Sequence, residues 1–268
     1  MIKGIDLIPF FLFFIYNKGM SFKQKFISTI SSKRFGSIFY PIFYIVFAVA
    51  IAISGSLIFN KYYYIYIYVS GNSMIPTLFG DTSRSYYGEA DTSKTAIDHL
   101  NRFDVLIVDY PSDWGTEEGY KVKRLWGFPG ETISLTYESG KVIFTATKEA
   151  ETYTVTGVFH NAETFDFETR TFTVPYYKFS TGNRVFKTYA HIRNIPPHTL
   201  KDDEYFVMGD NWSSSTDSYE RTIVENKTHL NYSYLRGRVI NILGIARYDK
   251  AQDALVDKVN FKYPLYRF

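Results

Sequence analysis

Residues Lys61-Tyr-Tyr-Tyr-Ile-Tyr-Ile-Tyr-Val69 mark a change in the pattern of the chain. From Tyr64 to Val69 tyrosine alternates with isoleucine or valine, which is the two-residue period of a β-strand. Tyrosine is also favoured where a membrane meets water, because its ring is buried while its hydroxyl stays hydrated. We therefore expect the chain to leave a bilayer at this point and to enter a β-strand directly.

Upstream of this stretch lies a long apolar segment, Ile38–Phe59, which has no charged residue. As a helix it would be roughly 33 Å long at about 1.5 Å per residue, enough to cross the hydrocarbon core of a bilayer. A cleavable signal peptide is a poorer explanation, because the segment begins far from the N-terminus and its apolar run is too long. The sequence thus predicts a membrane anchor over residues 1–60, with the span at 38–59.

The charges around the span predict its orientation. Only Lys61 lies close downstream, whereas the segment between Asn17 and Ser37 has no acidic residue and five basic ones: Lys18, Lys23, Lys25, Lys33 and Arg34. Positive charge stays on the cytoplasmic side, so the bulk of the chain should lie outside a cytoplasmic membrane. A second apolar stretch, Leu7–Tyr16 within residues 5–16, is short for a span. It is either an interfacial helix or a first span.

The remainder of the chain is rich in strand-type patterns. Aromatic residues make up 19% of the sequence, and nearly all are Tyr or Phe. The clearest predicted strands are Val105–Tyr110, Val142–Thr147, Tyr153–Phe159, Thr171–Val174 and Val239–Tyr248. We therefore expect a mostly β fold.

Composition excludes several functions. The chain has no cysteine, which rules out disulfides, a cysteine zinc site and a cysteine nucleophile. The net charge of +3 is too small to indicate a nucleic-acid partner. No metal or cofactor is predicted, because the histidines are scattered without metal-ligand spacing. They are His99, His160, His191, His198 and His229.

Three short segments carry residues suited to chemistry. They are Ser70-Gly-Asn-Ser-Met-Ile-Pro-Thr-Leu78, Val122-Lys-Arg-Leu-Trp-Gly-Phe-Pro-Gly-Glu131 and Tyr205-Phe-Val-Met-Gly-Asp-Asn-Trp-Ser-Ser-Ser-Thr-Asp-Ser218. Taken singly, each has a simple structural explanation as a turn or a hairpin loop. Taken together and in this order, they resemble the type I signal peptidases. The resemblance covers roughly residues 70–248 and the anchor before them, and it includes Arg102–Pro111, which is similar to the strand preceding the lysine segment in that family.

The resemblance implies a fold and a function. The fold is mostly antiparallel β, with a catalytic domain over residues 61–135 and 199–268. An inserted β-rich domain is expected at 136–198, because both later motifs lie outside that range. The implied activity is cleavage of signal peptides from exported preproteins, with small side chains before the cut. The implied partners are therefore preproteins and the lipid bilayer.

By the same resemblance Ser73 is the nucleophile and Lys123 is the general base. A serine hydroxyl needs a neighbouring base to become a good nucleophile. Free lysine has a pKa near 10.4 and is only about 0.04% neutral at pH 7, so burial must lower that pKa by several units. Lys121 is a competing candidate on the same strand face, but the register of the motif favours Lys123.

Other site residues follow from the motifs. The backbone N–H of Ser73 is the expected oxyanion donor. Gly71 stands where some family members have a serine that assists it, so either backbone donors suffice or Ser70 moves into place. Ser215 aligns with the serine that positions the lysine amine, and Asp217 aligns with a structural acid.

One departure from the family pattern concerns the acid. Tyr219 stands where relatives have an arginine that pairs with the residue at Asp217. We expect Arg221 to reach back to Asp217 instead and to hold the Ser215 loop; the alternative is that the Tyr219 hydroxyl takes over. Residues Gly209–Asn211 are expected to shape the loop rather than to react.

Three other functions compete with the peptidase. A soluble self-cleaving regulator similar to SOS-type repressors has the same dyad, but a membrane span argues against it. A catalytically inactive, membrane-anchored β domain that binds peptides would explain the departure at Tyr219. A structural envelope protein would not need Ser73 and Lys123 at these spacings.

Overall fold

The computed structural model describes residues 33–80, 84–115, 119–163, 174–182, 184–189, 191, 193–249, 251–252 and 254–264. The chain divides into two compact units, Met1–Asn60 and Lys61–Phe268. The apolar stretch Leu7–Tyr16 and the basic residues Lys18, Lys23 and Lys25 lie outside the described residues.

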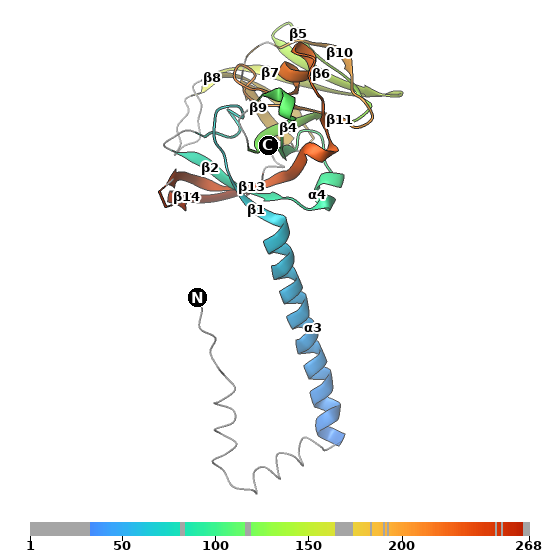
Figure 1. Ribbon diagram of the computed structural model, residues 1–268, viewed down its shortest axis with the longest axis vertical. Helices are drawn as coiled ribbons and strands as arrows, with labels where there is room; N and C mark the ends of the chain where they lie inside the picture. The colour runs from blue at the N-terminus through green and yellow to red at the C-terminus, as the bar shows by residue number, and fades with distance from the viewer. Residues whose placement is uncertain are drawn as a thin grey trace. The chain divides into compact units, whose positions relative to one another are not determined.

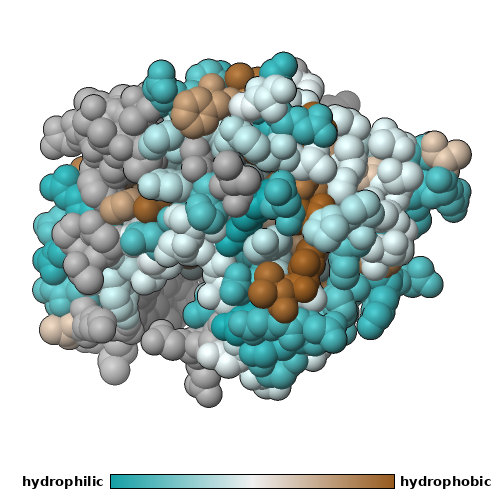
Figure 2. Space-filling model, turned by 90° about the horizontal axis from the view of Figure 1, so that it is seen from above, coloured by the Kyte–Doolittle hydropathy of each residue, from teal (hydrophilic) through white to brown (hydrophobic). Residues whose placement is uncertain are grey.

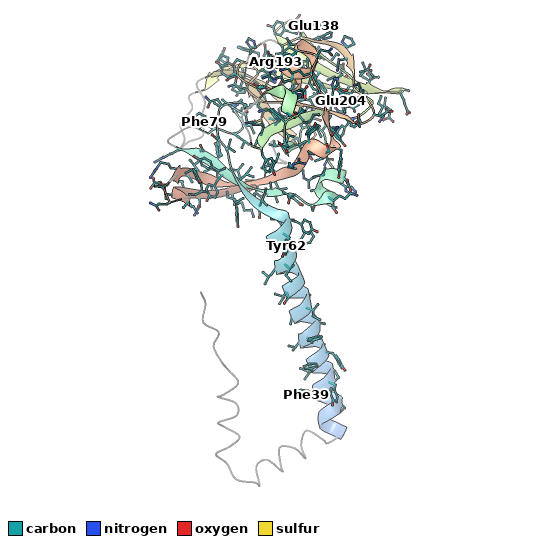
Figure 3. All side chains as sticks on the ribbon, viewed as in Figure 1. Phe39, Tyr62, Phe79, Glu138, Arg193 and Glu204 are labelled. Carbon is teal, nitrogen blue, oxygen red and sulfur yellow. The ribbon has the colours of Figure 1, made fainter. Side chains whose placement is uncertain are left out.

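The N-terminal unit contains most of the helix α3 (Lys33–Tyr63), whose last three residues belong to the second unit. Its segment Phe39–Phe59 is long and apolar enough to cross a membrane, and its side chains, such as Phe39, project outward from the helix (Figure 3). Phe39, Phe43 and Phe47 stack at four-residue spacing, with ring centroids 6.0 and 5.9 Å apart. The predicted apolar helix is confirmed, and its passage through a bilayer stays a prediction.

The β unit begins immediately after the helix with β1 (Tyr64–Tyr68), as the alternating tyrosines predict. This strand belongs to an eight-stranded sheet of order β1-β2-β13-β3-β4-β11-β12, with β14 also paired to β13. Every pairing in it is antiparallel. The other strands are β2 (Ser85–Asp91), β3 (Val105–Val108), β4 (Lys121–Gly127), β11 (Glu204–Met208), β12 (Leu230–Asn231), β13 (Leu235–Asp249) and β14 (Ala254–Pro264).

A second, six-stranded antiparallel sheet has the order β10-β5-β6-β7-β8-β9 (Figure 1). Its strands are β5 (Thr132–Glu138), β6 (Lys141–Lys148), β7 (Glu151–Glu163), β8 (Val174–Thr181), β9 (Arg184–Tyr189) and β10 (Ile195–Thr199). The mostly antiparallel β fold is thereby confirmed. The sheet occupies nearly the range predicted for the inserted domain, and the division into two domains stays a prediction.

The two sheets share a hydrophobic core. Trp126 of β4, in the larger sheet, packs against Phe144 of β6 and Phe179 of β8, with ring centroids 5.0 and 5.5 Å apart. Trp212, from the loop after β11, joins the same cluster. Edge-to-face aromatic pairs of this kind add stability beyond the area that they bury. The face of the β unit drawn in Figure 2 is largely hydrophilic or intermediate in hydropathy, with a few hydrophobic patches, whereas the span of α3 is apolar.

The short helices lie in the connections. They are α4 (Lys94–Asp98), the 3-10 turns η1 (Ser112–Trp114) and η3 (Tyr232–Tyr234), and the π-helical turn η2 (Tyr219–Val224). The Ser93 hydroxyl caps α4 by accepting a hydrogen bond from the Ala96 backbone N–H, with 3.1 Å between the nitrogen and the hydroxyl oxygen.

The larger sheet positions the second and third motifs side by side. Strand β4 lies between β3 and β11, and Lys123 pairs with Leu106 of β3. The pairing with β11 ends at Met208, opposite Arg124. The chain after Met208 therefore leaves the sheet next to Lys123, which places the loop carrying Ser215 and Asp217 near the lysine.

Candidate active site

The first and second motifs are in direct contact. Lys123 Nζ lies 2.7 Å from Ser73 Oγ, although the two residues are 50 positions apart in the chain. Ser73 is partly exposed on the turn that follows β1, whereas Lys123 is only 3% exposed in the middle of the sheet. A partly exposed hydroxyl beside a buried amine is the arrangement that a serine nucleophile and a lysine base require.

The surroundings of Lys123 disfavour its positive charge. Burial is the largest effect and lowers the pKa of Lys123 to about 8; the nearby charge of Asp217 opposes this by raising the pKa, and that of Lys121 lowers it. With this pKa, roughly one lysine in ten is neutral at pH 7, compared with about 0.04% of free lysines. The site thus meets the main chemical requirement for a lysine base.

Lys121, the competing candidate, lies two residues earlier on the same strand and is partly exposed. The contact with Ser73 is made by Lys123. The effect of Lys121 on the site is electrostatic, because its like charge helps to lower the pKa of Lys123.

The third motif fastens the loop that carries Ser73. The Asn211 amide N–H donates to the Ser73 carbonyl at 2.9 Å, and its side-chain amide donates to the Asn72 carbonyl at 3.0 Å. Asp210 accepts two hydrogen bonds from the guanidinium of Arg124, at 2.7 and 2.5 Å, and both side chains are fully buried. Such bidentate pairs are strong and fix orientation. These contacts agree with the loop-shaping role expected of Gly209–Asn211.

Ser215 lies close to Ser73, with Gly209 between them. A Cβ placed on Gly209 would come within 2.2 Å of Ser215 Oγ and 2.3 Å of the Ser73 carbonyl oxygen, so no side chain fits there. Ser215 is buried, and in the part of the chain that the structure describes its Oγ has no hydrogen-bond partner. A buried hydroxyl without a partner is costly and is available to a neighbouring amine or to substrate.

The prediction that Arg221 pairs with Asp217 is wrong. Arg221 pairs with Glu225, 2.5 Å away and four residues further along the chain. The fully buried Asp217 instead faces Arg193, whose Nη1 lies 3.2 Å from both carboxylate oxygens. Arg193, which is labelled in Figure 3, also donates to the Ser215 carbonyl at 3.4 Å. Because η2 begins at Tyr219 and coils the chain, Arg221 does not follow the extended path on which the expectation depended.

Tyr219 contributes in a way that the sequence did not suggest. Its backbone N–H donates to Asp217 at 3.1 Å, and its ring lies under the Arg193 guanidinium at 4.6 Å. The Gly209 N–H adds a further hydrogen bond to Asp217, at 3.0 Å. Arg193 lies just before β10, 24 residues before Asp217, and no motif marks it.

Gly71 has a backbone role. Its φ of +89° lies in the left-handed region, where a serine would be strained. Its amide donates to the Gly80 carbonyl at 3.0 Å, so it is not free for an oxyanion. Ser70 is exposed. These contacts leave the Ser73 N–H as the expected donor.

The family model described as "Signal peptidase, peptidase S26" matches residues 39–236, which include all three motifs and the apolar segment of α3. No curated protein matches the chain. The match covers well over half of the chain, and the folded β unit places the motif residues together. The chain therefore belongs to the S26 signal peptidase family of serine peptidases.

Proposed function

We propose that this protein is a membrane-anchored endopeptidase that removes signal peptides from exported preproteins, with Ser73 as nucleophile and Lys123 as general base. The observation that carries the proposal is the 2.7 Å contact between Ser73 Oγ and a buried lysine whose pKa is lowered to about 8. Membership of the signal peptidase family supports the substrate class.

The geometry supports a two-step reaction. Neutral Lys123 takes the hydroxyl proton while Ser73 Oγ attacks the scissile carbonyl, and the Ser73 N–H stabilises the oxyanion. The Lys123 ammonium then protonates the leaving amine, which leaves the signal peptide as an ester on Ser73. A water molecule that gives a proton to neutral Lys123 hydrolyses this ester and restores the hydroxyl.

The remaining site residues hold this arrangement. Ser215, whose hydroxyl is buried beside the Ser73 backbone, positions the amine during proton transfer. Asp217 and Arg193 keep the Ser215 loop in place through buried charge-assisted hydrogen bonds.

Anchoring by Phe39–Phe59 would keep the enzyme where preproteins emerge from the membrane. The helix is long and apolar enough for this task, and the basic residues before it favour an outward-facing β unit. The substrate region is then the end of a signal peptide, where small side chains precede the cut.

The rival proposal, an inactive peptide-binding domain, depended on the missing arginine at Tyr219. Arg193 supplies a guanidinium to Asp217 from another part of the chain, so this departure no longer argues against catalysis. The intact contact between Ser73 and Lys123 also favours an enzyme.

The test is a cleavage assay with detergent-solubilised protein and a purified preprotein. The account predicts one cut after a small residue at the end of the signal peptide, and no cut with Ser73→Ala, Lys123→Met or the double variant. The double variant should be no worse than either single variant, because the two residues act as one unit. Activity that survives in Lys123→Met but is lost in Lys121→Met would assign the base to Lys121.

A further inference from the structure

Three side chains from different strands or strand ends converge at the start of β11 in the larger sheet. His198 lies on β10, Glu204 begins β11, and His229 immediately precedes β12. Pairing of Glu204 with Asn231 brings His229 alongside, and the short turn between β10 and β11 brings His198 to the same place. One nitrogen from each imidazole and one carboxylate oxygen lie within 4.8 Å of one another (Glu204 is labelled in Figure 3).

All three of these atoms are buried, and two of them, Glu204 Oε1 and His229 Nδ1, are in direct contact with each other. Glu204 is 2% exposed; its Oε2 accepts a hydrogen bond from the Lys201 amide at 3.1 Å. Its Oε1 lies against His229 Nδ1 and 4.0 Å from His198 Nε2. Among the described residues His198 Nε2 has no hydrogen-bond partner, and the other two atoms have none besides each other. A buried carboxylate oxygen that faces two imidazole nitrogens, one of them without any hydrogen-bond partner among the described residues, is an arrangement that a bound cation would satisfy.

The donor set matches one class of ligand. Two imidazole nitrogens and one carboxylate oxygen are ligands that Zn²⁺ takes at about 2.0–2.2 Å, with a water in the fourth position. Tetrahedral geometry would place the donor atoms roughly 3.3 Å apart, so side-chain movements of about 1 Å suffice. We propose that His198, Glu204 and His229 form a binding site for a divalent transition-metal ion such as Zn²⁺.

Such an ion would act on the active-site loop from a distance. Glu204 and His229 are the two ends of the segment that contains Gly209, Ser215 and Asp217. A metal held by both ends ties the start and the end of this segment together in the folded state, and binding to the folded state alone stabilises the fold. The expected role is therefore structural: the ion stabilises the β unit and the loop that positions the lysine.

The first test is metal binding to the full chain, purified in detergent and treated with a chelator. Calorimetric titration with ZnCl₂ should show one ion per chain, and Co²⁺ should give the strong visible absorption of a tetrahedral site. With Zn²⁺ at about one hundred times its dissociation constant, the Tm should rise by roughly 5–10 °C. These readouts do not involve peptidase activity, so they are independent of the proposed function.

The variants locate the site. Glu204→Gln, which keeps the side-chain size, and His229→Ala should each weaken Zn²⁺ binding by at least about one hundred-fold. The matched control is His99→Ala, an exposed histidine at the end of α4, which should bind as tightly as the parent. Absence of stoichiometric binding in the parent protein, or unchanged affinity in Glu204→Gln and His229→Ala, would overturn the proposal.

Discussion

A lysine that acts as a base must be partly neutral near pH 7, and the place of Lys123 in the fold explains how this is achieved. It lies on β4 between two neighbouring strands, so its amine has little contact with water. Burial dominates the balance, while the acidic residues Asp217 and Asp210 stop the pKa from falling further. The result is a pKa of about 8, close to the pH at which a general base works best.

The first prediction concerns the pH dependence of cleavage. Because only neutral Lys123 accepts a proton, kcat/KM should rise about tenfold per pH unit below pH 8 and level off above it. Lys121→Met removes a like charge that lowers the pKa of Lys123, so its profile should move to higher pH. Lys141→Met, an exposed lysine at the start of β6, is the control and should leave the profile unchanged. A flat profile across this range would contradict a lysine base.

A second prediction concerns stability. The folded pKa of Lys123 lies below its unfolded value, so the charged form is disfavoured on folding, and this penalty grows as pH falls from about 10.5 to about 8. At pH 7 it is on the order of 3 kcal/mol. Lys123→Met, similar in size and uncharged, should therefore have a higher Tm than the parent at pH 7, and the gain should vanish above about pH 10.5. A lower Tm of Lys123→Met than of the parent at pH 7 would mean that the favourable contacts of the Lys123 amine contribute more free energy than its desolvation costs.

At the scale of elements, the Ser215 loop depends on an ion pair between the two sheets. Arg193 precedes β10 of the smaller sheet, whereas Asp217 follows β11 of the larger one. Both residues are buried, and two backbone N–H groups complete the coordination of the carboxylate. The smaller sheet therefore contributes directly to the geometry of the site.

The third prediction follows from this pair. Arg193→Ala leaves the buried Asp217 without its guanidinium and should destabilise the protein by about 3–5 kcal/mol. It should also move the pH–activity profile to higher pH, because Asp217 then acts on Lys123 unopposed. Differential scanning and the pH profile measure the two effects. Arg221→Ala is the matched control and should resemble the parent in both, since Arg221 pairs with Glu225. If Arg221→Ala changed the stability and the pH profile as much as Arg193→Ala, Arg221 would also have a role in holding the Ser215 loop.

The Ser215 loop also shows what the sequence can and cannot predict. The motif positions Ser73, Lys123, Ser215 and Asp217 were readable because each belongs to a short local pattern. The role of Arg193 could not be predicted, because its ion pair with Asp217 depends on how the two sheets pack together. The proximity of His198 and His229 could not be predicted either, because the two residues share no local spacing. The pairing of β11 with β12 brings them together.

For the whole molecule, the sequence predicted most of the architecture. Alternation at Tyr64–Tyr68 and the apolar run at Val105–Val108 correspond to β1 and β3. The predicted strand at 171–174 reaches the described residues only at Val174, the first residue of β8. The order of strands within each sheet was not predictable, because it depends on pairings between segments far apart in the chain.

The fourth prediction concerns topology. A reporter that is active only outside the cytoplasm, fused after Phe268, should be active in cells. Neutral replacements of the basic residues from Lys18 to Arg34 should weaken this orientation, because the positive charge before the span sets it. A cytoplasmic C-terminus in the unaltered protein would contradict an outward-leading span at Phe39–Phe59.

The central claim, that Ser73 is a nucleophile activated by Lys123, is tested most directly by covalent labelling. The purified protein is treated with a β-lactam-type or acyl-phosphonate inhibitor, and the modified peptide is identified by mass spectrometry. The account predicts one adduct on Ser73, none in Ser73→Ala, and strongly slowed labelling in Lys123→Met, where the base 2.7 Å from the hydroxyl is missing. An adduct on another residue, or labelling of Lys123→Met at the parent rate, would contradict it.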